Sequence, residues 1–483
     1  MELQKLLAGI EVVQCSAKMD TEIKSVCYSS RDVQPGDLFV AIPGFATDGH
    51  KYIPDAVARG AAAVLCEKQM PENAPWVQVK DARLALAQLG ANFYDHPAQK
   101  LKMIGVTGTN GKTSVTYLLK ELLERATGAK VGLIGTICNM IGGEVLPTER
   151  TTPESFELQA LLSQMQKAGC EYVVMEVSSH ALALHRVAGI RFRVGAFSNL
   201  TEDHLDFHKT MENYRQAKAK LFGICDRGVF NLDDPIAPKM IGDAACQVYT
   251  VSTGADADLR AQQILLESDR IEMDLVEGEQ RKHLKLGIPG RFTVSNSLLA
   301  LGIARQLGIG LDTAVEALHH ARGVKGRIEV VPTPGKEYTV LIDYAHTPDG
   351  LENVLRSVRD FAKGRLIALF GCGGDRDRAK RPMMGEIAAK EADLVIVTSD
   401  NPRTEVPEAI IADILGGMEH TPTPYVVEPD RRKAIRLALS LGKKNDIIVL
   451  AGKGHEDYQI IGKEKFHLDE REEVAAALWE EKQ

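Results

Sequence analysis

Long apolar runs and paired cysteines are missing from this sequence, and aromatic residues make up only 5% of it. No apolar stretch approaches the roughly 20 residues that a helix needs to cross a bilayer, which argues against membrane insertion. The first residues, "MELQKLLAGIEVVQ", carry acids and lack both a basic region and an apolar core, so we expect no signal peptide. The sequence also contains no internal repeat and no low-complexity segment.

The eight cysteines stand far apart, at positions 15, 27, 66, 138, 170, 225, 246 and 372. None of them forms a CxxC pair or a metal-ligand spacing, which excludes a disulfide framework and a zinc site built on cysteine. Scattered cysteines of this kind are typical of small core or loop residues in a reducing compartment. We therefore expect a cytoplasmic protein.

The composition is that of a soluble globular protein, with 44% hydrophobic and 26% charged residues. The net charge of −8 argues against a protein that coats nucleic acid, although a local basic pocket is compatible with it. A length of 483 residues exceeds one ordinary core and suggests about three domains.

The pattern of strands and helices divides the chain into three stretches. Residues 1–99 mix short strands with turns and end in the helical stretch "DARLALAQLGANFYDHP". Residues 100–329 open with a strand, a glycine-rich loop and a helix with apolar residues at 115, 118, 119, 122 and 123. Strands and helices alternate from there, and the alternation restarts in residues 330–483. We predict an α/β protein of three domains, with a central parallel-sheet domain and a Rossmann-like C-terminal domain.

Four stretches after residue 330 run from an apolar strand into a polar loop marked by glycine or proline. They are "VLIDYAH", "RLIALFGCGGDRDR", "ADLVIVTSDNPR" and "NDIIVLAGKGHED". Doubly wound sheets bind their ligands at the carboxyl ends of parallel strands, so these loops are candidates for one binding site.

The stretch "GVTGTNGKTS" (105–114) resembles a phosphate-binding loop. Its backbone N–H groups would hold phosphate oxygens, Lys112 would reach the terminal phosphates, and the Thr113 hydroxyl would bind Mg²⁺. The general pattern GxxxxGK[ST] requires glycine at position 106, where this chain has Val106, and Gly105 lies one residue too early.

The variant TGTNGKT/S resembles the ATP loop of the Mur ligase family and of its folylpolyglutamate synthetase relatives, which join a carboxylate to an amine with ATP. The resemblance covers nearly the whole chain. It includes residues 29–65, similar to a uridine-nucleotide-binding domain, and then, in the family's order, "TTPE", "MEVSSHALALHR", "SNLTEDHLDFH", "YRQAKAKLF", "PGRFTVSN", "GRIE", "DYAHTPDGL", "GCGGDRDRAKRP", "SDNPR" and "AGKGHEDYQ". The resemblance implies a UDP-substrate-binding domain over 1–99, an ATP-binding catalytic domain over 100–329 and an amino-acid-binding domain over 330–483.

The resemblance also implies the substrates and most site residues. It points to ATP, Mg²⁺, UDP-N-acetylmuramoyl-L-alanyl-D-glutamate and meso-diaminopimelate, with no nucleic acid, and we expect a monomer. For ATP it implies Gly108, Thr109, Asn110, Gly111, Lys112, Thr113, Ser114, Asn296 and Arg327. For the uridine-linked substrate it implies Ser30, Thr151, Thr152, Ser178 and Arg186, and for closure over the nucleotide Asp343 and His346. A cap on the helix before Pro153 is an equally good interpretation of the two threonines.

The metal ligands that the resemblance implies are Thr113, Glu176, His204 and Lys218, the last as a carbamate. Hydroxyl and carboxylate oxygens suit a hard ion such as Mg²⁺, whereas imidazole suits it less well. Lys220 competes with Lys218, because residues two apart on a helix face different sides and only one of them can point into the site. The Tyr-x-x-x-Lys register of the family selects Lys218.

The loop "SDNPR" has two interpretations. Asp, Asn and Pro after a strand form turns for backbone reasons alone. By resemblance, the loop reads the diamino acid together with neighbouring loops, through Arg376, Asp400, Asn401, Pro402, Arg403, Gly452 and Glu456. Arg403 and Arg376 would donate hydrogen bonds to the distal carboxylate of diaminopimelate. Its distal ammonium would donate to Asp400, Glu456 and the Gly452 carbonyl.

Three other functions compete with this interpretation. A lysine-adding ligase of the same family lacks the arginine at this place in the loop, and a folylpolyglutamate synthetase would not need residues 29–65. A P-loop nucleotide switch or binding protein could keep Gly111, Lys112 and Thr113, but it has no use for the metal-ligand set.

Overall fold

The computed structural model describes residues 1–44, 47–68 and 74–480, so positions 45–46 of the stretch 29–65 lie outside the described residues. By its contacts the chain forms two compact units, Met1–Val251 with Leu299–Gly310 and Ser252–Leu298 with Leu311–Gln483. The boundaries predicted near residues 99 and 329 are finer than this division and stay predictions. No helix within the described ranges combines the length and the apolar character that crossing a bilayer requires.

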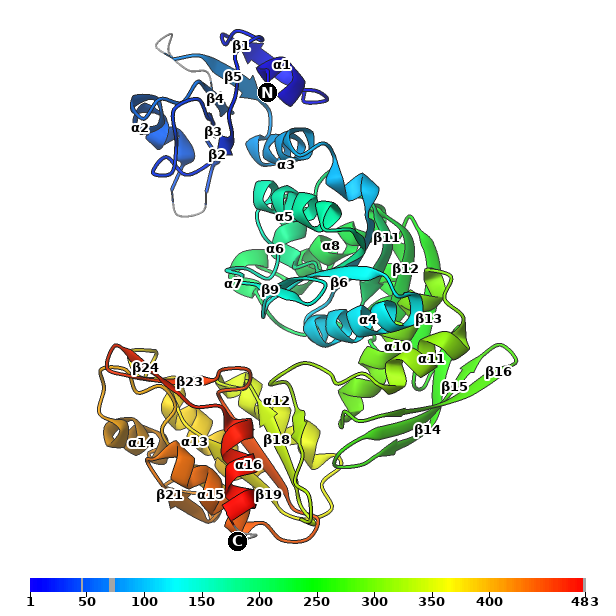
Figure 1. Cartoon of the computed structure of the whole chain (residues 1–483), viewed down its shortest axis with the longest axis vertical. Helices are drawn as coiled ribbons and strands as arrows, with labels where there is room; N and C mark the ends of the chain where they lie inside the picture. The colour runs from blue at the N-terminus through cyan, green and yellow to red at the C-terminus, as the bar shows by residue number, and fades with distance from the viewer. Residues whose placement is uncertain (45–46, 69–73, 481–483) are drawn as a thin grey trace. The chain divides into compact units, whose positions relative to one another are not determined.

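The first sheet of unit 1 has the strand order β1-β5-β4-β3-β2 and appears in blue in Figure 1. Its strands are β1 (Val12–Cys15), β2 (Val26–Cys27), β3 (Leu38–Val40), β4 (Ala63–Cys66) and β5 (Trp76–Val79), and only β1 is antiparallel to its neighbour. The helices around it are α1 (Leu3–Leu6), η1 (Gly49–Tyr52), α2 (Ile53–Ala58), α3 (Ala82–Phe93) and η2 (Pro97–Lys100). Asp81 caps α3 by accepting a hydrogen bond from the Leu84 N–H group, which fixes where this helix begins.

The sheet that carries the phosphate loop has eleven strands, of which those in unit 1 have the order β13-β12-β11-β6-β10-β7-β8-β9. These strands are β6 (Lys102–Thr107), β7 (Lys130–Ile134), β8 (Asn139–Ile141), β9 (Glu144–Leu146), β10 (Cys170–Glu176), β11 (Phe192–Phe197), β12 (Cys225–Asn231) and β13 (Gln247–Ser252). All of them pair in parallel except β8 and β9. The helices are α4 (Lys112–Thr127), α5 (Ser155–Lys167), α6 (Ser179–Ala183), α7 (Leu205–His208), α8 (Met211–Ala219), η3 (Lys220–Gly223) and α9 (Ala237–Gly242).

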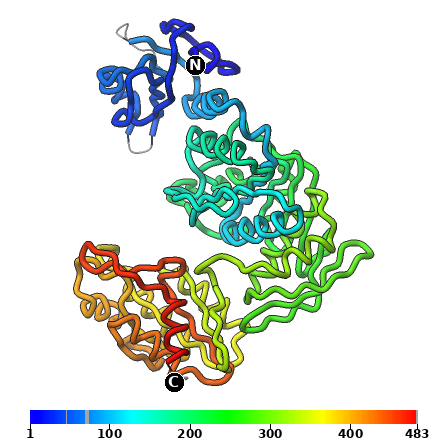
Figure 2. Tube along the Cα trace, in the orientation of Figure 1, coloured from blue at the N-terminus to red at the C-terminus, as the bar shows by residue number. Residues whose placement is uncertain are grey.

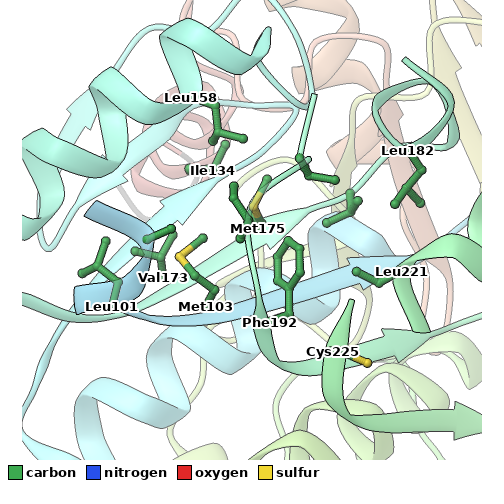
Figure 3. Close-up of a cluster of buried hydrophobic side chains, with 14 of the residues drawn as sticks. Leu101, Met103, Ile134, Leu158, Val173, Met175, Leu182, Phe192, Leu221 and Cys225 are labelled. Carbon is green, nitrogen blue, oxygen red and sulfur yellow. The ribbon is translucent and has the colours of Figure 1, made fainter. Parts of the chain in front are cut away.

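The core of this sheet follows from its sequence pattern. Strands buried on both faces are continuous apolar runs, as in β10, and side chains from β6, β10, β11 and α5 meet in the cluster of Figure 3. On α4 the predicted apolar positions 115, 118, 119, 122 and 123 are all buried, which confirms the helix. This packing holds the carboxyl ends of the parallel strands at one edge, where the site residues gather.

Unit 2 begins with an antiparallel ribbon, drawn in green in Figure 2. Its strands are β14 (Leu259–Leu266), β15 (Ile271–Glu277) and β16 (Gln280–Leu286). Helix α10 (Arg291–Gln306) follows, and its residues are divided between the two units at Leu298 and Leu299. Helix α11 (Leu311–His319) packs on β16.

The C-terminal sheet has the order β17-β18-β22-β19-β20-β21. Its strands are β17 (Glu329–Val331), β18 (Thr339–Asp343), β19 (Leu366–Phe370), β20 (Leu394–Val397), β21 (Tyr425–Val427) and β22 (Ile447–Ala451). Its helices are α12 (Pro348–Arg359), α13 (Lys380–Glu391), α14 (Pro407–Leu415), α15 (Arg431–Leu441) and α16 (Glu470–Glu480), and a hairpin joins β23 (Tyr458–Ile461) to β24 (Glu464–His467). The four loops singled out in the sequence follow β18, β22, β19 and β20, which are parallel neighbours, so the prediction that they share one edge is confirmed.

Candidate active site

The phosphate loop joins the end of β6 to the start of α4. Gly108 has a φ of +148°, and a Cβ atom at this position would lie 1.9 Å from the Ser198 Oγ atom. Only glycine fits such a backbone at such a distance. Val106, at the position that the general pattern gives to its first glycine, lies buried inside β6. The glycine that lets the loop backbone approach a neighbouring side chain is Gly108 instead.

Hydrogen bonds from the loop to residue 199 fix its shape. The Thr109 and Asn110 N–H groups donate to the backbone and side-chain oxygens of Asn199, each at 2.9 Å. Helix α4 starts after Gly111 without a side-chain cap, so the N–H groups of its first turn are available to an anion. Lys112 folds back onto the Gly108 and Thr109 carbonyls at 3.0 and 2.8 Å, and burial lowers its pKa.

The Glu176 carboxylate lies at the end of β10, beside the phosphate loop. Its Oε1 atom accepts hydrogen bonds from the Thr113 hydroxyl and the Thr136 N–H group, both at 2.9 Å, and its Oε2 atom accepts one from the Thr136 hydroxyl at 3.0 Å. A Cβ atom on Gly135 would lie 2.6 Å from Oε1, so glycine is what leaves room for the carboxylate. Thr136 was not singled out from the sequence.

This pair of oxygen donors fits Mg²⁺, which prefers carboxylate and hydroxyl oxygens beside phosphates. Within residues 1–44, 47–68 and 74–480, no three His, Cys, Asp or Glu side chains already converge on a metal position. Thr113 and Glu176 share a hydrogen bond. The other two predicted ligands are His204, which precedes α7, and Lys218, which lies in α8.

Lys218 extends from α8 to the phosphate loop. It is 1% exposed, and its Nζ atom donates to the Gly108 carbonyl at 2.7 Å and lies 4.5 Å from the centre of the Tyr214 ring. Burial, reinforced by the charge of Lys112, holds its pKa well below the usual range. Lys220 is exposed, so of the two competing lysines it is Lys218 that points toward the loop.

His204 stands in a group of histidine rings that the sequence did not reveal. It has a left-handed backbone (φ +53°), and its ring lies edge-on to His180 at 4.8 Å. His208 is buried with its Nε2 atom 2.9 Å from the Ser179 Oγ atom, and burial with the neighbouring His180 lowers its pKa to about 4. In the sequence, only the spacing of four residues between His204 and His208 indicated that these two rings lie near each other.

Of the two "TTP" threonines, Thr152 binds the end of β10, Thr151 contacts Thr136, and neither caps a helix. The Thr152 hydroxyl donates to the Glu176 carbonyl at 2.8 Å and accepts from the Ser178 N–H group at 3.2 Å. Thr151 lies 3.0 Å, hydroxyl to hydroxyl, from Thr136. The interpretation as a helix cap is wrong, because α5 begins after Glu154 with no side-chain cap hydrogen bond.

Arg186 joins this group through Thr152. Its guanidinium donates to the Thr152 carbonyl at 3.1 Å and pairs with Glu154 at 2.8 Å, while burial lowers its pKa. Its Nε atom is buried and has no partner among the described residues. No hydrogen bond within the described residues connects Ser30, in the loop after β2, to this group.

Asp343 anchors the second group of residues, in unit 2. Its carboxylate accepts hydrogen bonds from the Ile328 and Ala345 N–H groups at 2.8 and 2.9 Å, and burial raises its pKa. Tyr344 follows, with the Arg327 guanidinium 5.6 Å from its ring centre and the His346 ring 4.6 Å away. The remaining predicted nucleotide-binding residue, Asn296, is buried in α10.

The loops after β19 and β20 are joined into one surface. The Gly374 N–H group donates to the Asn401 carbonyl at 2.9 Å, and the Arg403 guanidinium donates to the Gly374 carbonyl at 2.8 Å. A Cβ atom on Gly374 would lie 1.9 Å from the Pro402 carbonyl oxygen. Arg376 follows on the same loop and is exposed, so the two predicted arginines belong to adjoining loops.

The predicted acceptors for an ammonium group surround a lysine of the chain itself. Lys453 is fully buried, with its Nζ atom 3.3 Å from Asp400, 3.1 Å from Asn401 and 3.0 Å from Glu456. Gly452 precedes it with a φ of +114°. The sequence interpretation missed this lysine, and its place between two glycines in "AGKGHED" was the only signal.

Three family profiles match the chain, each over a different range. They are the Mur ligase family catalytic domain at residues 22–94, the Mur ligase middle domain at 106–304 and the Mur ligase glutamate ligase domain at 326–454.

Full-length relatives agree with the profiles. The chain is 48% identical to a UDP-N-acetylmuramoyl-L-alanyl-D-glutamate–2,6-diaminopimelate ligase from Caldanaerobacter subterraneus, over 99% of each chain. It is 46% identical to a ligase of the same name from Clostridium acetobutylicum, over 99% of this chain and all of that one. A solved structure of a ligase so named is 33% identical, with a TM-score of 0.77 over 100% of this chain and 99% of the other.

Proposed function

We propose, from the premise that the chain belongs to the Mur ligase family, that it joins meso-diaminopimelate to UDP-N-acetylmuramoyl-L-alanyl-D-glutamate with the consumption of ATP. The reaction would form a peptidoglycan precursor in the cytoplasm, and the enzyme would act as a monomer. The observation that supports the amino-acid specificity is the hydrogen-bonded pair of loops that carries Arg376 and Arg403, together with the ion pairs that Lys453 forms with Asp400 and Glu456.

In this proposal each of the three predicted stretches has one task. Residues 1–99 bind the uridine end of the substrate through Ser30, residues 100–329 bind ATP, and residues 330–483 bind the amino acid. The contacts between Thr152, Ser178 and Arg186 support a site for the acidic peptide close to Glu176, because hydroxyls, N–H groups and a guanidinium all suit carboxylate oxygens.

ATP would bind at the start of α4, and Mg²⁺ would be held by Thr113, Glu176, His204 and Lys218. A carboxylate is a poor electrophile, and phosphorylation by ATP makes it an acyl phosphate that an uncharged amine can attack. The N–H groups of residues 108–114 and the Lys112 ammonium would hold the phosphates. Enzymes catalyse phosphoryl transfer mainly by positioning the reacting groups in this way. Mg²⁺ would supply neutralisation of the phosphate charges.

Lys218 suits the carbamate role for a reason visible in its surroundings. Carbon dioxide reacts with a neutral amine, and the lowered pKa of the buried Lys218 favours the neutral form. The carbamate would then carry the negative charge that a second Mg²⁺ requires. Asp343, at the end of β18, and His346, in the loop after it, would act on the nucleotide side.

Selectivity for diaminopimelate over lysine follows from the arginines. Lysine lacks the distal carboxylate, so it would leave Arg403 with its backbone carbonyl contact but without a carboxylate partner. Sites built to pair a polar group reject analogues that lack it by about 10⁴-fold. A lysine-adding ligase remains the alternative within the family, and a folylpolyglutamate synthetase-like ligase the alternative outside it.

The deciding experiment measures phosphate release with ATP, Mg²⁺ and UDP-N-acetylmuramoyl-L-alanyl-D-glutamate. Meso-diaminopimelate, L-lysine and D-glutamate are compared as acceptors, and we expect turnover with meso-diaminopimelate alone. Turnover with lysine at a comparable rate would overturn the assignment of Arg403 but keep the ligase. No turnover with any acceptor, in protein that binds ATP, would contradict the proposed function.

A further inference from the structure

Lys453 is an ammonium group buried where the proposed function places a substrate ammonium. Its side chain is 0% exposed and lies in the loop between β22 and β23. An ammonium group has three N–H donors, and Lys453 has three oxygen acceptors within 3.3 Å, on Asp400, Asn401 and Glu456. A buried lysine that is fully hydrogen-bonded needs no further partner, so its position is fixed.

These hydrogen bonds use only half of each carboxylate. The Lys453 Nζ atom donates hydrogen bonds to Oδ1 of Asp400 and to Oε2 of Glu456. The Asn401 amide also donates to Oε2 of Glu456, at 3.0 Å. Among the hydrogen bonds that the described residues form, none reaches Oδ2 of Asp400 or Oε1 of Glu456. Two carboxylate oxygens, one from each side of the lysine, are therefore left as acceptors.

The formal charges of Lys453, Asp400 and Glu456 also leave room for one more cation. One ammonium and two carboxylates sum to −1 at pH 7, which a single additional cation would neutralise. Without Lys453 the sum would be −2, and without one carboxylate it would be zero. These three side chains are thus balanced for one additional ammonium, while Arg403, which donates to the Gly374 carbonyl, and the exposed Arg376 lie on the loops after β20 and β19.

The glycines on either side, Gly452 and Gly454, leave the space that lets Lys453 lie against the two carboxylates. A Cβ atom on Gly452 would lie 3.1 Å from Oδ2 of Asp400, and one on Gly454 would lie 2.5 Å from the Tyr344 Cβ atom. Side chains at either position would close the space beside the free oxygen or displace Tyr344. The loop therefore places Lys453 against the carboxylates and leaves Oδ2 of Asp400 accessible to a small group.

We propose that Lys453 is a positioning residue for the amino-acid substrate: it binds one oxygen each of Asp400 and Glu456 and leaves the other two to receive the distal ammonium of the diamino acid. This inference rests on the proposed function. Lys453 does not touch the reacting atoms. It sets the orientation and the charge of the groups that do bind the substrate.

The test replaces Lys453 by methionine, which keeps an unbranched side chain of similar length and removes the charge. We expect K453M to raise the KM for meso-diaminopimelate by about 10- to 100-fold, the factor that hydrogen bonds to charged groups are worth, while the KM values for ATP and for the uridine-linked substrate stay within about twofold. K444M is the matched control, because Lys444 pairs with Glu337 on the surface of the same unit, and we expect no change in any KM.

A double variant keeps the test decisive if K453M does not fold. K453M/E456Q restores the charge of −1, so it should fold and bind diaminopimelate more tightly than E456Q alone. Wild-type protein is assayed first, because absence of turnover there would count against the proposed function and not against Lys453. A folded K453M with unchanged KM for diaminopimelate would overturn the inference, and so would a double variant that binds no better than E456Q.

Discussion

At the scale of single residues, the site depends on groups whose burial changes their chemistry. Lys112 and Lys218 both donate to the Gly108 carbonyl, at 3.0 and 2.7 Å, so two ammonium groups share one acceptor. Burial disfavours the charged form of each lysine, and for Lys218 the neighbouring charge of Lys112 adds to the effect. At 1% exposure, Lys218 has a pKa well below the usual range of a lysine.

On the proposed role of Lys218 as a carbamate ligand of Mg²⁺, we expect K218A to lose activity by about 10- to 100-fold. Bicarbonate should raise the activity of wild-type protein that has been depleted of carbon dioxide, and it should not raise that of K218A. Phosphate release at pH 7 to 8 measures both effects. K220A is the control, since Lys220 lies two residues away and is exposed. An inactive K220A with an active K218A would reverse the assignment of the lysines.

At the scale of elements, a buried ion pair holds the loops after β20 and β22 to helices α15 and α16. Arg431, at the start of α15, pairs with Glu470, at the start of α16, at 2.7 Å, and both side chains are 0% exposed. The same guanidinium donates to the Ser399 carbonyl at 3.3 Å and to the Ala451 carbonyl at 2.9 Å. These carbonyls follow β20 and end β22, so one arginine ties together the two loops that carry Asp400 and Lys453.

Removing one partner of this pair leaves the other charge buried without compensation. We expect R431M to lower the free energy of unfolding by roughly 3–5 kcal/mol, measured by urea denaturation. R436M is the control on the same two helices, because the pair Arg436–Glu480 is largely exposed and such pairs contribute about 1 kcal/mol or less. Equal losses in the two variants would contradict this account of the buried pair.

At the scale of the whole molecule, the chain passes between the two compact units three times. It leaves unit 1 after Val251, returns for Leu299–Gly310 and leaves again at Leu311. The returning segment is the second half of α10 and contributes fully buried Leu299, Leu301 and Ile303. Gly302 in it lies so close to β12 and β13 that a Cβ atom would be 2.9 Å from the side chains of Val229 and Val251.

A fragment that ends at Val251 should therefore fail to fold on its own. It lacks the returning helix, and each of the three large apolar side chains contributes roughly 2 kcal/mol of burial. A fragment of residues 1–310 retains the helix, and we expect it to unfold cooperatively when followed by circular dichroism. Cooperative unfolding of residues 1–251 with the same midpoint would contradict this account of α10.

The sequence by itself was sufficient for the family and for the order of the elements. The resemblance to the Mur ligases and the three-domain α/β fold are confirmed by the three profiles and by the full-length relatives. The apolar face of α4 and the four loops after parallel strands could be predicted because they depend on the spacing of neighbouring residues. The site residues that follow from the resemblance stay predictions, each with a place in the structure.

Only the tertiary structure decided which groups share a partner. Lys453 donates to a carboxylate 53 residues away, Thr136 to a carboxylate 40 residues away, and the His180 ring contacts the ring of His204, which precedes another helix. Contacts of this kind depend on how strands are ordered in a sheet, which leaves no periodic trace in the sequence. The helix-cap interpretation of "TTP" could not be rejected from the sequence for the same reason, since the carbonyl that Thr152 binds comes from β10.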